Sequence, residues 1–233
     1  EEVLLYTDNV VVVNDGSTDQ TQNILQHFDH KITVLHHSKN QGKGSALKTA
    51  FRWAQENNYQ HAITIDSDGQ HFASDLPLFV QKIKSHPNTL FIGARNMDQA
   101  NVPGKCSFGN KFSNFWFWVE TGIKLSDTQS GYRSYPLHAM KDLKLLTNKF
   151  EFEVEVIVKS AWKGIAVENI PIQVHYEPGD QRVSHFRPFK DFTRISILNT
   201  WLVTLAILYY IPFRFIRRLK WSNIKAFFKD QFL

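Results

Sequence analysis

The sequence predicts an α/β protein in which helices flank a mostly parallel β-sheet. Short apolar runs alternate with helical patterns over residues 1–100. The runs are apolar at successive positions, which is typical of strands buried on both faces of a parallel sheet. Polar clusters at residues 14–19, 66–71 and 95–98 follow these runs. Because ligands of such sheets bind beyond the carboxyl ends of the strands, we expect the functional site there.

The first two strand–helix units follow from β-branched runs and helical spacing. Val10–Val13 predicts a strand, because four valines in a row precede a turn. Thr18–Phe28 places large apolar side chains on one side of a helix. Ile32–Leu35 is a second aliphatic run and predicts a strand. Ser45–Asn57 repeats apolar residues at helical spacing and predicts the second helix.

The alternation continues to residue 92 and then becomes irregular. Strands are expected at Ala62–Ile65 and Leu90–Ile92, with a helix at Asp75–Ser85 between them. The later elements are expected to be an aromatic-rich helix at Lys105–Gly122, a polar loop at Ser126–Pro136, a helix at Phe150–Trp162, a closing strand at Ile165–His175 and a polar loop at Glu177–Pro188.

Composition and charge restrict the class of protein. The 233 residues are 42% hydrophobic and 21% charged, which is typical of a folded chain. The single cysteine, Cys106, excludes an internal disulfide. Residues 181–233 carry ten Lys or Arg and two Asp, which gives this tail a charge of +8. Such a tail fits an anionic membrane or a nucleic acid. Because its aromatic residues lie among aliphatic runs rather than on a polar stacking surface, we expect a membrane partner and no nucleic acid.

The segment Ile195–Phe213 is mostly apolar and contains no charged residue. At 1.5 Å per residue a helix of this length spans about 28 Å, close to the thickness of the bilayer hydrocarbon. Aromatic and basic residues follow it, as at a cytoplasmic membrane interface. The alternative is a helix packed on a soluble core. We therefore predict two parts: a domain of residues 1–190, and a basic, apolar, membrane-associated helical segment of residues 191–233 that either spans the bilayer or lies in its interface.

Two carboxylates follow the third predicted strand. Asp66 and Asp68 are separated by one residue, and extended backbone points alternate side chains to the same side. Paired hard oxygens suit Mg²⁺ or Mn²⁺, which takes further ligands from a diphosphate. Gln70, two residues on, offers another oxygen. The alternative is a solvated acidic turn without a metal.

Asp15 lies in the turn that ends the first strand. A capped turn explains the neighbouring Gly16 and Ser17 but not a carboxylate at this position. Asp15 is therefore a candidate to accept hydrogen bonds from a nucleobase or ribose. Lys43, close to the start of the next helix, is a candidate to approach the diphosphate, although a solvated lysine is equally compatible with the sequence.

Together these motifs resemble family 2 glycosyltransferases, which have the GT-A fold. The resemblance covers about residues 9–190 and is strongest for the dolichyl-phosphate mannose synthase-like and other polyprenyl-phosphate sugar synthases. It rests on Asn-Asp-Gly-Ser-Thr-Asp, residues 14–19, and Asp-Ser-Asp-Gly-Gln, residues 66–70. By this resemblance Asp15 contacts the nucleotide of a UDP- or GDP-linked donor. Asp66, Asp68 and Gln70 hold the metal and the donor diphosphate.

Three further motifs extend the resemblance toward the acceptor. Gly93-Ala94-Arg95 is similar to a strand that ends in an arginine beside the acceptor phosphate. Asp127 to Arg133 is similar to an acceptor-side Asp-x-x-Ser-Gly-aromatic-Arg element. Arg182-Val183-Ser184-His185 is similar to a donor-binding loop, with His185 in the place of the family's lysine. The family's first strand, which lines the nucleobase, is not found in the sequence, so part of the donor pocket is expected to be missing.

The resemblance implies an inverting, metal-dependent transferase at the cytoplasmic face of a membrane, in glycan synthesis for the cell envelope. Arg95 and Arg133 would hold a lipid phosphate acceptor. If the acceptor is instead a hydroxyl of a glycolipid or glycan, Asp127 is the candidate base. A non-catalytic module that binds nucleotide-sugars at the membrane is the alternative from another class.

Overall fold

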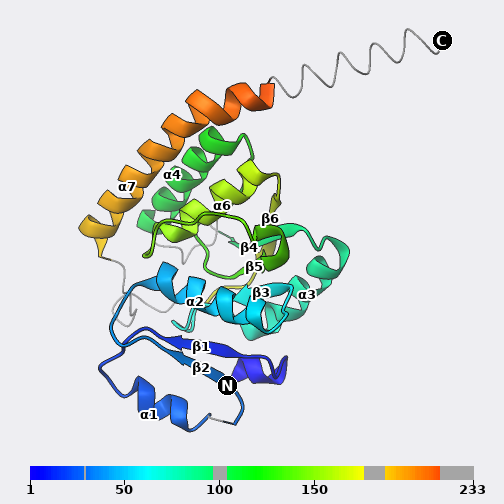
Figure 1. Ribbon diagram of the computed structural model, residues 1–233, viewed down its shortest axis with the longest axis vertical. Coiled ribbons are helices and arrows are strands. Elements are labelled where there is room, and N and C mark those ends of the chain that lie inside the picture. The colour runs from blue at the N-terminus through cyan, green and yellow to red at the C-terminus, as the bar shows by residue number, and fades with distance from the viewer. Residues whose placement is uncertain (29, 97–103, 176–186, 216–233) are drawn as a thin grey trace, which may run out of the picture.

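The computed structural model describes residues 1–28, 30–96, 104–175 and 187–215. It confirms an α/β fold with helices around the sheet strands (Figure 1). The strands are β1 (Val11–Asn14), β2 (Thr33–His36), β3 (His61–Thr64), β4 (Thr89–Arg95), β5 (Arg133–Pro136) and β6 (Ala166–Ile172). The helices are η1 (Glu2–Leu5), α1 (Thr21–Gln26), α2 (Lys43–Glu56), η2 (Ala73–Asp75), α3 (Leu76–Ser85), α4 (Gly104–Thr121), α5 (Leu137–Met140), α6 (Phe152–Lys163), α7 (Pro188–Leu205) and the π-helical η4 (Ala206–Tyr210).

The described strands form two sheets. β1 and β2 pair in parallel, and the larger sheet has the order β3-β5-β4-β6. β5 runs antiparallel to β3 and β4, whereas β4 and β6 are parallel. Three of the four strands in this sheet therefore run in the same direction, as the sequence predicts. Among the described residues, β1 and β3 are not paired with each other.

One element was predicted wrongly. The sequence predicts a polar loop over residues 126–136, but its last four residues form β5, and all four are buried. A strand of this kind lacks the apolar run that marks its neighbours, because it begins with an arginine and a serine. The first predicted helix is also shorter than expected, since α1 covers Thr21–Gln26 only.

The central strands β4 and β5 of the larger sheet are buried on both faces. Successive residues of β4 point to opposite sides, so Leu90 and Ile92 join one apolar cluster and Phe91 joins another. The first cluster packs against helices that include α2 and α6, through Phe51 and Phe152. This two-sided cover fixes the strands, and with them the loops at their ends.

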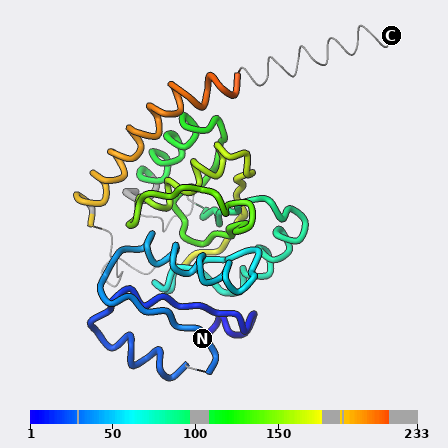
Figure 2. Tube along the Cα trace, in the orientation of Figure 1, coloured from blue at the N-terminus to red at the C-terminus, as the bar shows by residue number. Residues whose placement is uncertain are grey.

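The helices α4, α6 and α7 pack together at one end of the molecule, and the β1–β2 pair with α1 lies at the other (Figures 1 and 2). The continuous helix Phe189–Phe215 contains an 18-residue window with a mean hydropathy of 1.6, and it is long and apolar enough to cross a membrane by length and composition. Pro212 cannot donate a backbone hydrogen bond, and its ring crowds the preceding turn. The π-helical turn η4 lies directly before it, as expected where a proline disturbs a helix.

Candidate active site

Asp66 and Lys43 form the centre of the candidate site. Asp66 lies two residues beyond the end of β3, and Lys43 is the first residue of α2. The ammonium of Lys43 is 2.8 Å from Asp66 Oδ1 and 2.9 Å from Glu153 Oε2. Burial alone would lower the pKa of Lys43, but the carboxylates of Glu153 and Asp66 raise it above its ordinary value. The ammonium is therefore charged at neutral pH and shared by two carboxylates.

The Asp66 carboxylate also lies against the loop that precedes β5. A Cβ atom built on Gly131 would be 2.2 Å from Asp66 Oδ2, so only glycine leaves room for the carboxylate at this position. Burial alone would raise the pKa of Asp66, but the Lys43 ammonium lowers it below its ordinary value. The loop around Gly131 belongs to the element that the sequence associates with the acceptor. The segments that the sequence predicts to serve the donor and the acceptor thus meet at Asp66.

Asp68 and Gln70 complete the predicted metal-ligand set. The side chain of Asp68 is exposed, and its Oδ1 accepts a hydrogen bond from the backbone amide of Gln70. The three residues offer hard oxygen donors at one loop, which is the chemistry that Mg²⁺ and Mn²⁺ require. The ammonium at Asp66 shows that this loop already attracts a cation. A divalent ion at these residues stays a prediction: their oxygens are of the kind that it requires, but the described residues contain no group of three or more His, Cys, Asp or Glu side chains that could hold a metal ion.

Asp15 organises the loop that leads to Lys43. Its carboxylate accepts hydrogen bonds from the backbone amides of Gln41 and Gly42, at 2.9 and 2.7 Å, and lies 2.6 Å from His37 Nδ1. Burial alone would raise the pKa of Asp15, but these hydrogen bonds lower it. Gly42 precedes the helix with φ +101°, a conformation that favours glycine. The contacts of Asp15 thereby fix the start of α2.

Arg95 and Asp127 form a paired unit on the acceptor side. Arg95 Nε is 2.6 Å from Asp127 Oδ2, and Arg95 Nη2 is 3.1 Å from Asp127 Oδ1. Asp127 is fully buried, and the backbone amides of Gln129 and Ser130 also donate to it. Asn169 of β6 accepts from the amide of Asp127 and donates to its carbonyl. The Asp127 carboxylate is therefore engaged on all sides by donors that hold the loop.

The geometry changes the role expected for Arg133. Its side chain is fully buried, and Nε, Nη1 and Nη2 donate to the carbonyls of Ser130, Glu153 and Thr128 at 2.6–3.0 Å. A guanidinium held in this way does not reach an acceptor phosphate. We therefore correct the expected contact with the acceptor: Arg133 fixes the acceptor-side loop to α6.

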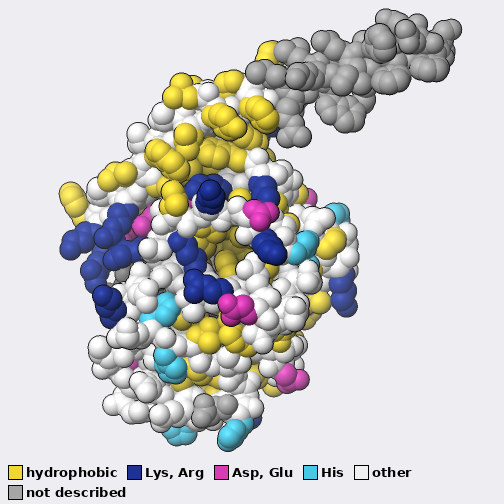
Figure 3. All heavy atoms as spheres, in the orientation of Figure 1, with side chains coloured by type: hydrophobic (Ala, Val, Ile, Leu, Met, Phe, Trp, Pro, Cys, Tyr) yellow, Lys and Arg dark blue, Asp and Glu magenta, His cyan; other side chains and the backbone are white. Residues whose placement is uncertain are grey.

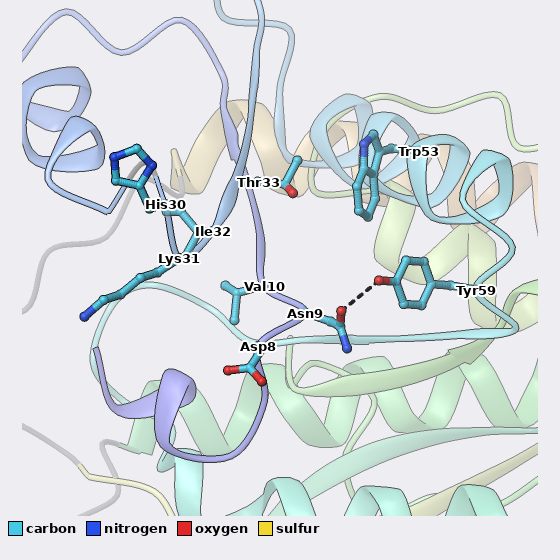
Figure 4. Close-up of a pocket in the computed structure, with 9 residues that line it drawn as sticks. All are labelled: Asp8, Asn9, Val10, His30, Lys31, Ile32, Thr33, Trp53 and Tyr59. Atoms are coloured by element: carbon cyan, nitrogen blue, oxygen red, sulfur yellow. Dashed lines mark hydrogen bonds between the residues drawn. The ribbon is translucent and has the colours of Figure 1, made fainter.

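Arg182, Ser184 and His185 fall outside the described residues. A cavity of about 210 Å³ lies at the amino ends of β1 and β2, where Asn9 accepts a hydrogen bond from Tyr59 (Figure 4). The cavity lies at the opposite end of these two strands from Asp15, and no predicted site residue lines it.

Sequence reasoning missed three residues of the site: Glu153, His37 and Asn169. Glu153 had a usable signal, because it precedes Val156 and Ile157 by three and four positions and so lies on the apolar stripe of its helix. His37 is paired with Asp15 from 22 residues away, and Asn169 contacts a loop more than 40 residues earlier. No local pattern indicates either contact.

Solved structures share this fold. The crystal structure of S. aureus TarS residues 1–349 matches 87% of the chain with a TM-score of 0.52 and 19% identity, and the chain spans 56% of it. Glucosyl-3-phosphoglycerate synthase from Mycobacterium tuberculosis, in complex with Mn²⁺, uridine diphosphate and glucosyl-3-phosphoglycerate, matches 86% of the chain and 69% of its own length. Its TM-score is 0.57 and its identity 16%. The molecule has the GT-A fold of nucleotide-sugar transferases.

Sequence comparison gives the family. The profile described as "Glycosyl transferase family 2" matches residues 3–128. An uncharacterised protein of Methanocaldococcus jannaschii is 32% identical over 173 residues, which cover 72% of the chain and 70% of that protein. The chain therefore belongs to glycosyltransferase family 2 and is a glycosyltransferase.

Two relatives have names that state an activity. The UDP-N-acetylglucosamine–dolichyl-phosphate N-acetylglucosaminyltransferase of Methanococcus voltae is 26% identical over 72% of the chain and 75% of its own length. The undecaprenyl-phosphate mannosyltransferase of Micrococcus luteus is 27% identical over 76% of each protein. Both relatives support the subgroup of polyprenyl-phosphate sugar synthases that the motifs indicate.

Proposed function

We propose that the protein transfers a sugar from a UDP- or GDP-linked donor to a polyprenyl phosphate at a membrane surface, with inversion at the anomeric carbon. One observation carries the proposal: Lys43, Asp66 and the loop around Gly131 meet beyond the carboxyl end of β3. A diphosphate and an acceptor brought to this point would lie within one small site. The named activities of the two relatives supply the chemical class of the acceptor.

The donor side of the mechanism rests on charge. Asp66, Asp68 and Gln70 are proposed to hold Mg²⁺ or Mn²⁺, which stabilises the negative charge of the departing nucleoside diphosphate when bound. Lys43 adds a second positive charge beside the same diphosphate. Asp15 keeps the start of α2, and so Lys43, in place. Arg182, Ser184 and His185 stay predicted donor contacts.

The acceptor side favours a phosphate over a hydroxyl. A hydroxyl needs a base, and Asp127, which is paired with Arg95, is the candidate that the sequence indicates. Its carboxylate is buried and occupied by the donors of Arg95, Gln129 and Ser130. A lipid phosphate is already an anion and attacks without loss of a proton. Arg95, with 12% of its side chain exposed, is the proposed contact for this phosphate, at the edge of its pair with Asp127.

The outer faces of α4 and α7 are proposed to lie on the membrane. Hydrophobic side chains cover this end of the molecule (Figure 3). On α4, Phe108 and Phe115 are 74% and 51% exposed, and on α7 and η4 the exposed apolar residues include Phe189 and Leu208. An apolar surface of this kind suits the acyl boundary of a bilayer. The catalytic domain is proposed to lie on the cytoplasmic side, and the basic residues of the tail support this orientation.

The test is a donor and acceptor screen in detergent. The protein would be incubated with Mn²⁺ or Mg²⁺, undecaprenyl phosphate and a panel of UDP- and GDP-sugars, and release of nucleoside diphosphate would be measured. We expect release that requires both metal and lipid, and that falls on the order of 10²-fold or more in Asp68→Ala. Asp142→Ala, which removes a carboxylate that is 85% exposed, is the matched control.

The outcomes separate the alternatives. Release without the lipid phosphate, but with a glycolipid acceptor and an acid-stable product, would show that the acceptor is a hydroxyl. Binding of nucleotide without turnover of any donor would favour a non-catalytic module. Turnover that persists in Asp68→Ala would contradict the proposed metal site.

A further inference from the structure

The Lys43 ammonium occupies the carboxylate that the proposed metal needs. It is 2.8 Å from Asp66 Oδ1, and 25% of the Lys43 side chain and 30% of the Asp66 side chain are exposed. A divalent ion that binds Asp66 would place two more positive charges within a few ångströms of this ammonium. Coulomb repulsion at that distance is large in a partly buried site. The ammonium and the metal therefore cannot both keep their shortest contacts with Asp66.

Glu153 provides a second carboxylate partner for the Lys43 ammonium. Its Oε2 is 2.9 Å from the Lys43 ammonium, and its side chain is 12% exposed. The backbone of Glu153 is held in place, because its carbonyl accepts a hydrogen bond from Arg133 Nη1 at 2.7 Å. The flexible stem of a lysine lets the ammonium move toward Glu153 while the backbone of α2 stays in place.

The backbone around Lys43 leaves little freedom for other movements. Gly42 is held by Asp15, and a Cβ atom on Gly44 would be 2.4 Å from Phe152 Cβ. The start of α2 is thus packed directly on the start of α6. Because both ends of the Lys43–Glu153 contact are attached to fixed backbone, the distance between the two charged groups depends on the conformations of these two side chains.

We propose that Lys43 is a tethered cation that competes with the divalent metal for Asp66, and that Glu153 positions the ammonium away from Asp66 when the metal is bound. The inference rests on the proposed function, which requires the metal. It makes Glu153 a positioning residue: it acts on the metal site only through Lys43. The Asp66 carboxylate would then have a cation beside it in both states, the ammonium without the metal and the metal when it is bound.

The test measures Mn²⁺ affinity without a donor, by calorimetry or by the electron paramagnetic resonance signal of free Mn²⁺. Lys43→Met removes the competitor, and we expect tighter Mn²⁺ binding, by about tenfold, which corresponds to 1.4 kcal/mol. Glu153→Gln leaves the ammonium with Asp66 as its only carboxylate partner, and we expect weaker binding by a similar factor. Lys43→Arg keeps a cation and should bind Mn²⁺ nearly as the unchanged protein does.

A double variant separates an effect through Lys43 from a direct one. If Glu153 acts only through the ammonium, Lys43→Met with Glu153→Gln should bind Mn²⁺ as Lys43→Met does. Lys48→Met is the matched control, because Lys48 lies on the same helix but is paired with Asn148. If Glu153→Gln fails to fold by circular dichroism, Glu153→Asp replaces it, and a shortened reach should also weaken Mn²⁺ binding.

The possible results decide between the inference and the proposed function. Unchanged or weaker Mn²⁺ binding in Lys43→Met would overturn the competition, even if the protein transfers sugar. Binding that appears only in Lys43→Met would support it strongly. If neither protein binds Mn²⁺ while sugar transfer persists, both the metal site and the inference are wrong but the transferase function stands.

Discussion

Replacing Glu120 by glutamine is expected to stabilise the protein, and the gain should grow as the pH rises. Glu120 lies near the end of α4 and is fully buried. Neither of its carboxylate oxygens has a hydrogen-bond partner among the described residues. Burial raises the pKa of Glu120 from 4.5 to about 8. The carboxyl group is therefore neutral in the folded protein at pH 7 and ionised in the unfolded chain.

The magnitude follows from the two pKa values. Between pH 4.5 and 8 the free energy of the unfolded state falls by about 1.4 kcal/mol per pH unit relative to the folded state, because only the unfolded chain releases the proton. The cost to folding is roughly 0.7 kcal/mol at pH 5 and roughly 3 kcal/mol at pH 7. The stability contributed by the neutral group is thus complete below pH 4.5 and is lost as the pH rises toward about 8. Glutamine does not ionise and avoids this loss.

Thermal unfolding in detergent at pH 5, 6, 7 and 8 provides the assay. For a chain of this size, 1 kcal/mol shifts the midpoint by roughly 2–4 °C, so Glu120→Gln should gain roughly 6–12 °C at pH 7 and little at pH 5. Glu168→Gln, at an exposed position of β6, should show no such trend. The reasoning is refuted if the unfolding midpoints of Glu120→Gln and Glu168→Gln differ by the same amount at every pH from 5 to 8.

Three other changes test the site and the surface. Gly131→Ala places a Cβ atom 2.2 Å from Asp66 Oδ2 and should displace that carboxylate. We expect the rate of sugar transfer to fall by roughly 10²-fold, with little change in Tm. A rate equal to that of Gly109→Ala, where an added Cβ has room, would contradict this. Asn169→Ala removes hydrogen bonds that hold the Asp127 loop. In denaturant titrations the free energy of unfolding should fall by roughly 2 kcal/mol. An unchanged value would mean that other contacts hold the loop. Phe115→Glu should weaken binding to anionic vesicles by roughly tenfold or more in a sedimentation assay, and an equal loss in Ile24→Glu, on α1 at the far end, would argue against a membrane-facing surface.

The strands that the sequence predicts are those that carry a run of apolar residues. Val11–Asn14, Thr33–His36 and Thr89–Arg95 carry β-branched or aliphatic runs, and the pattern locates them within one to three residues. The strand Arg133–Pro136 is more fully buried than β1 and β2, but its first residue satisfies burial by donating to three carbonyls. An arginine that is buried by hydrogen bonding has no signature in a hydropathy pattern, so this strand reads as a loop.

The same distinction applies to the site: the sequence predicts neighbours within one motif but not contacts between distant segments. Motif spacing predicts that Asp66, Asp68 and Gln70 share a loop, because the three are close in sequence. It does not predict the partner of Asp66, since Lys43 and Glu153 come from helices 23 residues before it and 87 residues after it. Each is an ordinary charged residue in its own segment. Only the packing of α2 against α6 gives them a shared function.

The contacts of Asp15 link the two halves of the site. Its carboxylate holds the amide of Gly42, Gly42 sets the start of α2, and the next residue is Lys43. The ammonium of Lys43 then meets Asp66, whose carboxylate lies against Gly131 in the acceptor-side loop. A nucleotide that draws Asp15 away from Gly42 would therefore loosen Lys43, and with it the cation at Asp66. On the proposed function, donor binding at one end would change the charge available to the metal and the acceptor at the other, through a continuous series of contacts.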